Sequence, residues 1–245
     1  MSDLEIRVGT SGYSYKEWRG SFYPEKLKPA AMLGYYAERF SAVEINNTFY
    51  KLPERTTLER WAEQVPEGFV FVLKASQRIT HRQRLAPESK ETLDYLLDTA
   101  SALGARLGPI LFQTPPFLKK DAARLRAFLE LLPSERRFAV EFRHETWRDD
   151  EVHDALRARN AALVCADTEE AGAEGAPIVP TADWGYLRLR RCDYDAAALA
   201  PWAERIRSQP WRQAFVFFKH EEGRPLGWPA IRQFLTLAGA RAPAS

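Results

Sequence analysis

Short apolar runs alternate with longer stretches of helical periodicity along this chain of 245 residues. Eight of the short runs are rich in Val, Ile, Leu and Phe and have the length of β-strands. These predicted strands are Ile6–Gly12, Val43–Thr48, Val70–Ser76, Ile110–Thr114, Phe138–Arg143, Leu163–Thr168, Tyr186–Arg190 and Phe215–Lys219.

The segments between the strands carry apolar residues at helical spacing. Pro29 opens the first predicted helix, and Asp121 and Asp149 are the predicted N-caps of two later ones. The further predicted helices are Thr56–Gln64, Pro87–Leu103, Asp121–Leu131, Asp149–Arg159, Ala196–Ser208 and Trp228–Ala238. The connection after the sixth strand is rich in Gly, Ala and Pro, which predicts a loop or a degenerate helix there.

Strands that alternate with helices predict βαβ units and a parallel sheet, so the fold class is α/β. Eight units of roughly 31 residues match the repeat length of such units, and a (β/α)₈ barrel closes at about 250 residues. No linker or change of composition divides the chain. We therefore expect a single-domain TIM-type (β/α)₈ barrel over residues 1–245, with an open doubly wound sheet as the alternative that periodicity does not separate from it.

Side chains alternate between the two faces of a strand, so each strand presents one face to the helices and one to the barrel axis. If the apolar face packs on the helices, the polar face points inward, mostly near the carboxyl ends of the strands where barrel active sites lie. The charged residues on that face comprise five cations and three acids, and an anion would balance the excess. The inward polar residues predicted in this way are Glu44, Asn46, Lys74, Ser76, Gln113, Glu141, Arg143, Asp167, Arg188, Arg190 and Lys219.

A basic loop, RITHRQR (Arg78–Arg84), follows the third strand, and its arginines suit phosphate and carboxylate groups. The whole chain is nearly neutral, with 35 Lys and Arg against 33 Asp and Glu, which argues against a general nucleic-acid coat. We therefore expect an anionic small molecule, phosphorylated or nucleotide-like, as the partner. The alternative is a non-catalytic nucleic-acid-binding protein that uses this loop and the aromatic residues of the rim.

Acid–base chemistry, as in hydrolysis or isomerisation, is the chemistry that these residue types favour. We predict Glu44 or Glu141 as the base, Asp167 as its partner, and His81 or His144 as the acid. The predicted anion-binding residues are Lys74, Arg143, Arg188, Arg190 and Lys219. The predicted pocket residues are Thr10, Ser11, Asn46, Tyr50, Gln113 and Trp147.

Two other chemistries use overlapping residues. Schiff-base chemistry would use Lys74 or Lys219, because an inward lysine among cations has a lowered pKa. A divalent metal is the second alternative, although the sequence has no HExxH motif and no Cys pair, and we predict no cofactor. The residues that could hold such a metal are Glu141, His144, Asp167, His220 and Glu221.

The first residues, MSDLEIRVGTSG, lack the basic and apolar regions of a secretory signal, and no apolar run approaches the roughly 20 residues of a membrane span. Cys165 and Cys192 both lie in strand-like runs, which is typical of buried thiols in a reducing compartment. We therefore expect a cytoplasmic protein that does not bind a membrane.

Six ordered motifs carry a resemblance to a known family: GTSGYSYKEWRGSFYP, YYAERFSAVEINNTFYKLP, FVLKASQRITH, LGPILFQTPP, FAVEFRHETW and ALVCADT. Together they resemble the YecE-like family, also called domain of unknown function 72, from about Ile6 to Leu237. The resemblance implies a TIM-type barrel related to the endonuclease IV and xylose isomerase-like barrels, which adds a metal-dependent nuclease to the alternatives. It implies no reaction.

The family's motif residues fall at positions that strand alternation selects independently for the most part. They are Thr10, Ser11, Glu44, Asn46, Thr48, Tyr50, Lys74, His81, Gln113, Glu141, Arg143, His144, Trp147, Asp167 and Arg188. The last strand departs from the family pattern: many members have an Asn-Asn-Asp type sequence there, whereas this chain has FKHEEGR at Phe218–Arg224.

Overall fold

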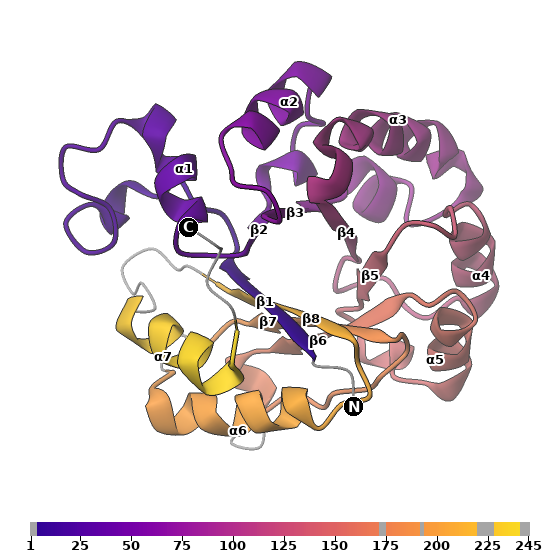
Figure 1. Cartoon of the computed structure of the whole chain (residues 1–245). Helices are drawn as coiled ribbons and strands as arrows, with labels where there is room; N and C mark the ends of the chain where they lie inside the picture. Colours follow the sequence, from indigo (N-terminus) through magenta and orange to yellow (C-terminus); the bar gives the residue numbers. More distant parts are fainter. Residues whose placement is uncertain (1–3, 172–174, 192–193, 220–227, 241–245) are drawn as a thin grey trace.

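Eight parallel strands form one sheet that curves into a nearly closed barrel in a computed structural model (Figure 1). The structure describes residues 4–171, 175–191, 194–219 and 228–240. The strands are hydrogen-bonded in the order β1-β8-β7-β6-β5-β4-β3-β2. Their bounds are β1 Glu5–Thr10, β2 Ala42–Ile45, β3 Val70–Lys74, β4 Leu107–Gln113, β5 Phe138–Glu141, β6 Ala162–Asp167, β7 Trp184–Leu189 and β8 Gln213–Phe218. The predicted α/β barrel and its eight strands are confirmed.

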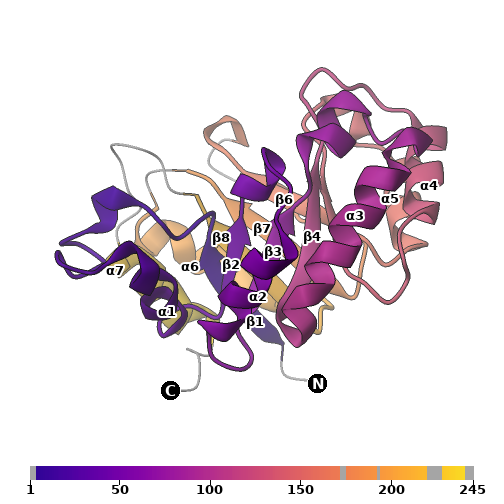
Figure 2. The same cartoon turned by 90° about the horizontal axis from the view of Figure 1, so that it is seen from above.

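The described residues form seven α-helices around the strands, with α2 to α5 along one side and α6 and α7 along another (Figures 1 and 2). Asp121 caps α4 by accepting a hydrogen bond from the Arg124 amide at 2.9 Å, and Asp149 caps α5 by accepting from the Glu151 amide at 2.9 Å. Both predicted N-caps are therefore confirmed. The helices are α1 Met32–Ala37, α2 Arg55–Glu63, α3 Lys90–Ala100, α4 Ala122–Glu130, α5 Asp150–Arg157, α6 Ala196–Arg207 and α7 Trp228–Ala238.

The connection between β6 and β7 holds no α-helix in its described part, only a 3₁₀ turn at Glu169–Ala171. The Thr181 hydroxyl fastens this connection to the start of β6, accepting from the Leu163 amide at 2.8 Å and donating to the Ala161 carbonyl at 2.7 Å. Asn160 and Asp183 add two further hydrogen bonds. In its described part the Gly-, Ala- and Pro-rich sequence thus forms a loop apart from this 3₁₀ turn, the first of the two forms that its composition predicts.

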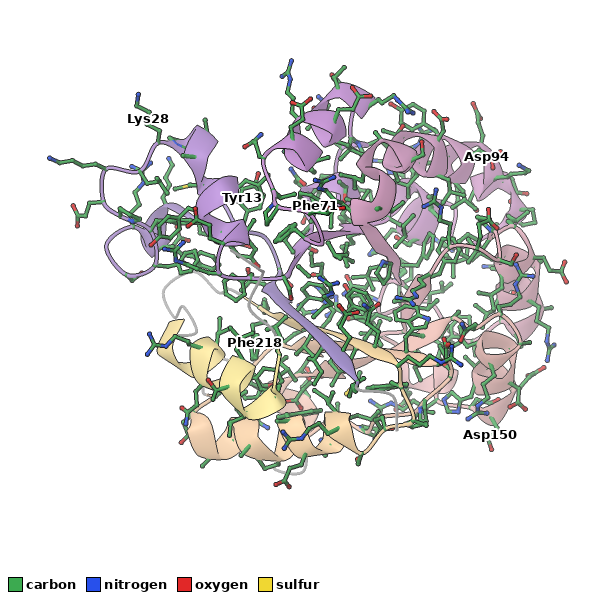
Figure 3. The ribbon with its side chains drawn as sticks, viewed as in Figure 1. Tyr13, Lys28, Phe71, Asp94, Asp150 and Phe218 are labelled. Carbon is green, nitrogen blue, oxygen red and sulfur yellow. The ribbon has the colours of Figure 1, made fainter. Side chains whose placement is uncertain are left out.

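Apolar side chains form two layers, one between the strands and the helices and one inside the barrel. Outward residues such as Phe71 and Phe218 pack between strands and helices, whereas Asp94 and Asp150 lie on the outer surface of the molecule (Figure 3). The inward layer fills the barrel axis with side chains. Its members are Ala42, Val72, Leu111, Ala139, Ala162, Val164, Trp184, Tyr186, Phe215 and Phe217.

Side chains, together with one backbone bridge between Ser11 and Glu44, join β1 to β2. The Val8 amide donates to the Ser41 hydroxyl at 3.1 Å, and the Thr10 amide donates to the Tyr36 hydroxyl at 2.8 Å, which in turn donates to the Ala42 carbonyl at 3.1 Å. Gly9 permits this approach, since a Cβ there would lie 2.0 Å from the Ala42 carbonyl oxygen. Thr10 therefore belongs to the seam between β1 and β2 and not to a pocket.

Candidate functional site

A buried ion-pair cluster lies where β2, β5 and β7 end, directly above the apolar filling of the barrel. Arg188 donates from Nη2 to Glu44 Oε1 at 2.8 Å and from Nη1 to Glu141 Oε2 at 2.6 Å. All three side chains are at most 5% exposed. Because Ala42 and Ala139 share the inward face with Glu44 and Glu141, the predicted strand alternation of β2 and β5 is confirmed.

Glu44 receives four hydrogen bonds. Ser11, Asn46 and Arg188 donate to Oε1, and the Tyr186 hydroxyl donates to Oε2 at 2.6 Å. Burial by itself raises the pKa of Glu44, but the Arg188 charge and the hydrogen bonds outweigh it and lower the pKa. Glu44 is therefore ionised at neutral pH, and its oxygens are already occupied by donors of the protein.

A chain of hydrogen bonds leads from Glu141 to Lys74. Gln113 donates from Nε2 to Glu141 Oε1 at 2.7 Å, and its Oε1 accepts from Lys74 Nζ at 2.9 Å. Arg190 approaches the same Glu141 oxygen at 3.6 Å. Burial raises the pKa of Glu141, yet Arg188 and Arg190 reverse that effect and lower it. Glu141 thus orients Gln113 and two arginines while it stays ionised.

The pKa values of the three cations of the cluster are shifted in different directions. The pKa of Arg188 is raised, because Glu44 and Glu141 outweigh the effect of burial. Burial and the nearby Arg188 charge lower the pKa of Lys74 to about 8, and the same two causes lower the pKa of Arg190. Lys74 is therefore the cation of this cluster that loses its proton most easily.

Phe49 and His81 form the wall of the mouth beside Lys74. Thr48 donates to the Lys74 carbonyl at 2.6 Å, which holds the 3₁₀ turn Asn47–Phe49 against the end of β3. Lys74 Nζ lies 4.3 Å from the centre of the Phe49 ring, and the His81 ring meets Phe49 edge to face at 4.9 Å. Burial, Lys74 and Arg143 lower the pKa of His81, so its ring is neutral at pH 7.

Asp167 lies outside this cluster, and the expectation that it points inward is wrong. On β6 the inward residues are Ala162, Val164 and Ala166, and Asp167 is on the opposite face. There it is buried, accepting hydrogen bonds from the Tyr194 hydroxyl and from the Ala176 amide at 3.0 Å. Strand alternation was misread because a small alanine, not a polar residue, occupies the inward position next to Asp167.

Two other predicted residues serve the loop after β5. His144 Nδ1 accepts from the Thr146 amide at 3.2 Å and so caps the 3₁₀ turn Glu145–Trp147. Trp147 is buried, stacks on Phe142 at 4.3 Å and donates to the Leu118 carbonyl at 2.7 Å. Trp147 therefore packs in the outer core and does not line the mouth.

The remaining predicted residues lie at the rim or beyond the described residues. Tyr50 is 75% exposed, and Arg143, Arg78, Arg82 and Arg84 are exposed as well. Lys219 follows β8 in the inward phase and is half-buried, whereas His220 and Glu221 lie outside the described residues.

Within the described ranges, no three His, Cys, Asp or Glu side chains are grouped as metal ligands. The helices of those ranges are all too short or too polar to span a bilayer.

Tyr186 is the member of the cluster that the sequence prediction omits. It lies two residues before Arg188 on β7 and therefore shares its inward face. Its ring packs in the apolar filling of the barrel, while its hydroxyl reaches Glu44. Strand alternation would have found Tyr186, had tyrosine been counted among the polar residues.

A parallel eight-stranded barrel with charged side chains gathered at the carboxyl ends of its strands defines a TIM-type barrel protein with a polar mouth. The sequence matches, over residues 7–244, the family described as "Protein of unknown function DUF72". The chain belongs to this family, which confirms the resemblance carried by the six motifs.

Curated and solved relatives agree with this assignment. UPF0759 protein YunF of Bacillus subtilis (strain 168) is 30% identical over 150 residues, which are 58% of this chain and 52% of that protein. UPF0759 protein YecE of Escherichia coli (strain K12) is 34% identical over 110 residues, which are 44% of this chain and 40% of that protein. The matched segments span about half the length of these two relatives or less. A DUF72 family protein from Thermotoga maritima MSB8 has a similar structure, with a TM-score of 0.80, 26% identity and coverage of 96% of this chain and 99% of that one.

Proposed function

We propose that this protein binds a small anionic molecule, bearing a phosphate or carboxylate group, at the mouth formed by the carboxyl ends of its strands. One observation carries the proposal: both carboxylates of the buried cluster are occupied by donors of the protein, while Lys74 and Arg190 retain donors of their own. Within the described residues, Lys74 Nζ makes one hydrogen bond, to Gln113, and Arg190 approaches only Glu141, at 3.6 Å.

The charges of the cluster support the same proposal. Lys74, Arg188 and Arg190 carry three positive charges when protonated, and Glu44 and Glu141 carry two negative ones. Since the group is largely removed from water, an uncompensated positive charge is costly, and a bound anion would offset it. Arg143 lies close enough to lower the pKa of His81 and so adds to the positive potential at the rim.

The residues divide into a scaffold and a contact set. Glu44 and Glu141 hold Arg188 in place, and their lowered pKa values make them poor proton acceptors at neutral pH. We assign contact with the anion to Lys74, Arg190 and Arg143. Proton transfer, in hydrolysis or isomerisation, then falls to His81, whose ring is neutral at pH 7, and to Lys74, whose pKa is lowered to about 8.

Binding of inorganic phosphate and ribose 5-phosphate, measured by titration calorimetry and thermal shift, tests this site. The double variant with Lys74→Met and Arg190→Met should bind at least tenfold more weakly, because it lacks both contact cations. The matched control is Arg212→Met, which removes an exposed arginine at the opposite end of the barrel, just before β8. Equal loss of affinity in the control, or no binding by the unaltered protein at millimolar ligand, would refute the proposal.

One observation favours nucleic acid as a second candidate ligand. Exposed aromatic rings accompany the basic loop at the rim: Phe117 is 62% exposed with the Arg84 guanidinium 5.5 Å from its ring centre, and Tyr50 is 75% exposed. Stacked bases and a phosphate backbone would suit such a surface. Substituting Ala for Arg78, Arg82 and Arg84 together should then weaken oligonucleotide binding and flatten its salt dependence, while phosphate binding at the mouth is unchanged.

A further inference from the structure

Lys74 differs from Arg188 and Arg190, the other cations of the buried cluster, because its amine contacts no carboxylate in the described part of the chain. Its two contacts are the Gln113 amide oxygen at 2.9 Å and the face of the Phe49 ring. A lysine used only as a charge is usually paired with an acid when it is largely buried. The nearby acids, Glu44 and Glu141, are instead bound to Arg188.

The orientation of Gln113 keeps the Lys74 amine in place in both of its protonation states. Because Gln113 Nε2 donates to Glu141, its carbonyl oxygen must face Lys74. An amide oxygen accepts an N–H from an ammonium group and from a neutral amine alike. The neutral amine therefore stays at the same position, with its lone pair available to a ligand. The pKa of about 8 provides a substantial neutral fraction near physiological pH.

We propose that Lys74 is a carbonyl-reactive amine that forms an imine with the ligand, and that this ligand is an aldehyde or ketone bearing a phosphate or carboxylate group. The inference rests on the proposed function, since the anionic group would be held by Arg190 and Arg143 while Lys74 meets the carbonyl carbon.

The reaction needs no oxidant or reductant. The neutral Nζ forms a bond to the carbonyl carbon, and the carbonyl oxygen takes up a proton while the nitrogen loses one, which gives a carbinolamine. Loss of that oxygen as water then leaves the C=N bond. His81 is placed to carry the protons: its ring contacts the same Phe49 as Lys74, and Nδ1 is bonded to Thr80 at 2.8 Å. Nε2 makes no hydrogen bond to any described residue.

An imine at Lys74 would specify the chemistry of the mouth. A protonated imine withdraws electrons from the neighbouring carbon and makes the removal of a proton there easier. Isomerisation of an anionic carbonyl compound is the reaction class that this arrangement fits.

The test is reductive trapping with pyridoxal 5′-phosphate and borohydride, followed by peptide mapping by mass spectrometry. Lys74 should be labelled first among the lysines of the chain and close to one label per molecule. Its labelling rate should level off above about pH 8, whereas the rate at exposed lysines should continue to rise toward pH 10. Lys74→Arg should abolish this label, because a guanidinium group forms no imine under these conditions. The control Lys51→Arg, at a lysine whose side chain is 85% exposed, should leave it unchanged.

Two further probes separate failure of this inference from failure of the proposed anion site. Pyridoxine 5′-phosphate has the phosphate but no aldehyde, and pyridoxal has the aldehyde but no phosphate. Binding of pyridoxine 5′-phosphate together with no preferred label on Lys74 would overturn the imine and leave the anion site standing. Equal labelling of Lys74 by pyridoxal and its phosphate, with no binding of pyridoxine 5′-phosphate, would overturn the anion site and keep the reactive amine. Since the peptide map uses the unaltered protein, the result stands even if a variant fails to fold.

Discussion

The two halves of the barrel interior differ in polarity: one is filled by apolar side chains and the other by charged ones. In the half around the amino ends of the strands, Trp184, Phe215 and small residues such as Ala42 and Ala139 fill the axis. In the other half Glu44, Glu141 and Arg188 occupy the axis, the two glutamates lying two residues beyond Ala42 and Ala139 on the same strands. The first half stabilises the fold by apolar burial, whereas the second removes three charges from water and gains little net stability in return. The polar half therefore contributes little to the stability of the fold, which agrees with the ligand site proposed above.

Truncating the apolar half should have the largest effect on stability. Phe215→Ala removes a buried ring that meets Trp184 edge to face at 5.9 Å, and we expect a loss of about 4 kcal/mol in the free energy of unfolding. The loss should be the same at pH 5 and pH 7, since no titrating group is involved. Urea unfolding at both pH values measures it, and a loss that depends on pH would contradict a purely apolar contribution from this half.

Breaking the polar half should cost about 3 kcal/mol at pH 7 and less in acid. In Arg188→Met the two carboxylates lose their counter-ion, so burial raises their pKa values above those of the unfolded chain. A raised folded-state pKa favours the folded protein as pH falls, and the deficit should therefore shrink between pH 7 and pH 5.

In the unaltered protein, the contribution of these two carboxylates to stability changes with pH in the opposite direction. The lowered pKa values of Glu44 and Glu141 contribute stability that is present above the pKa of an ordinary glutamate. That contribution is lost only as pH falls through the lowered values. A deficit in Arg188→Met that grows between pH 7 and pH 5 would contradict the assigned ion pairs.

Tyr186→Phe should have the smallest of these effects, because Tyr186 belongs to both halves. The variant keeps the ring in the apolar filling and removes only the hydroxyl that donates to Glu44 Oε2 at 2.6 Å. We expect a loss of about 2 kcal/mol, the usual cost of a hydrogen bond to a charged group. Thermal unfolding with and without phosphate measures it, and phosphate affinity should stay within about twofold, since Tyr186 supports the scaffold only. A large fall in affinity would instead place its hydroxyl at the ligand.

Strand alternation predicted the polar half of the interior well, because each side chain of a strand faces either the barrel axis or the helices. Five strands, β2 to β5 and β7, place their polar residues inward as expected. Strand alternation fails on β6. The neighbouring residues Ala166 and Asp167 lie on opposite faces, and their residue types do not show which of the two faces the barrel axis. Contacts with Tyr194, 27 positions away, and with the Ala176 amide hold Asp167 on the outward face.

Roles within the site depend on contacts that a sequence does not contain. Glu141 was predicted as a base from its residue type, and only its contacts with Arg188 and Gln113 show it to be a buried anchor with a lowered pKa. His144 and Trp147 lie next to it in sequence but belong to a turn cap and to the outer core. Proximity along the chain was a poor guide at this corner, because β5 ends at Glu141 and the backbone then leaves the barrel axis.

Arg188 also bears on the order in which the molecule assembles. Its partners are 144 and 47 positions away along the chain, so each ion pair needs two distant strands to meet and the complete cluster needs three. Interactions that are absent from the transition state of folding change the rate of unfolding rather than the rate of folding. We expect the cluster at the mouth to form late, because its three strands must first be in place. Substitutions there should therefore alter the rate of unfolding far more than the rate of folding.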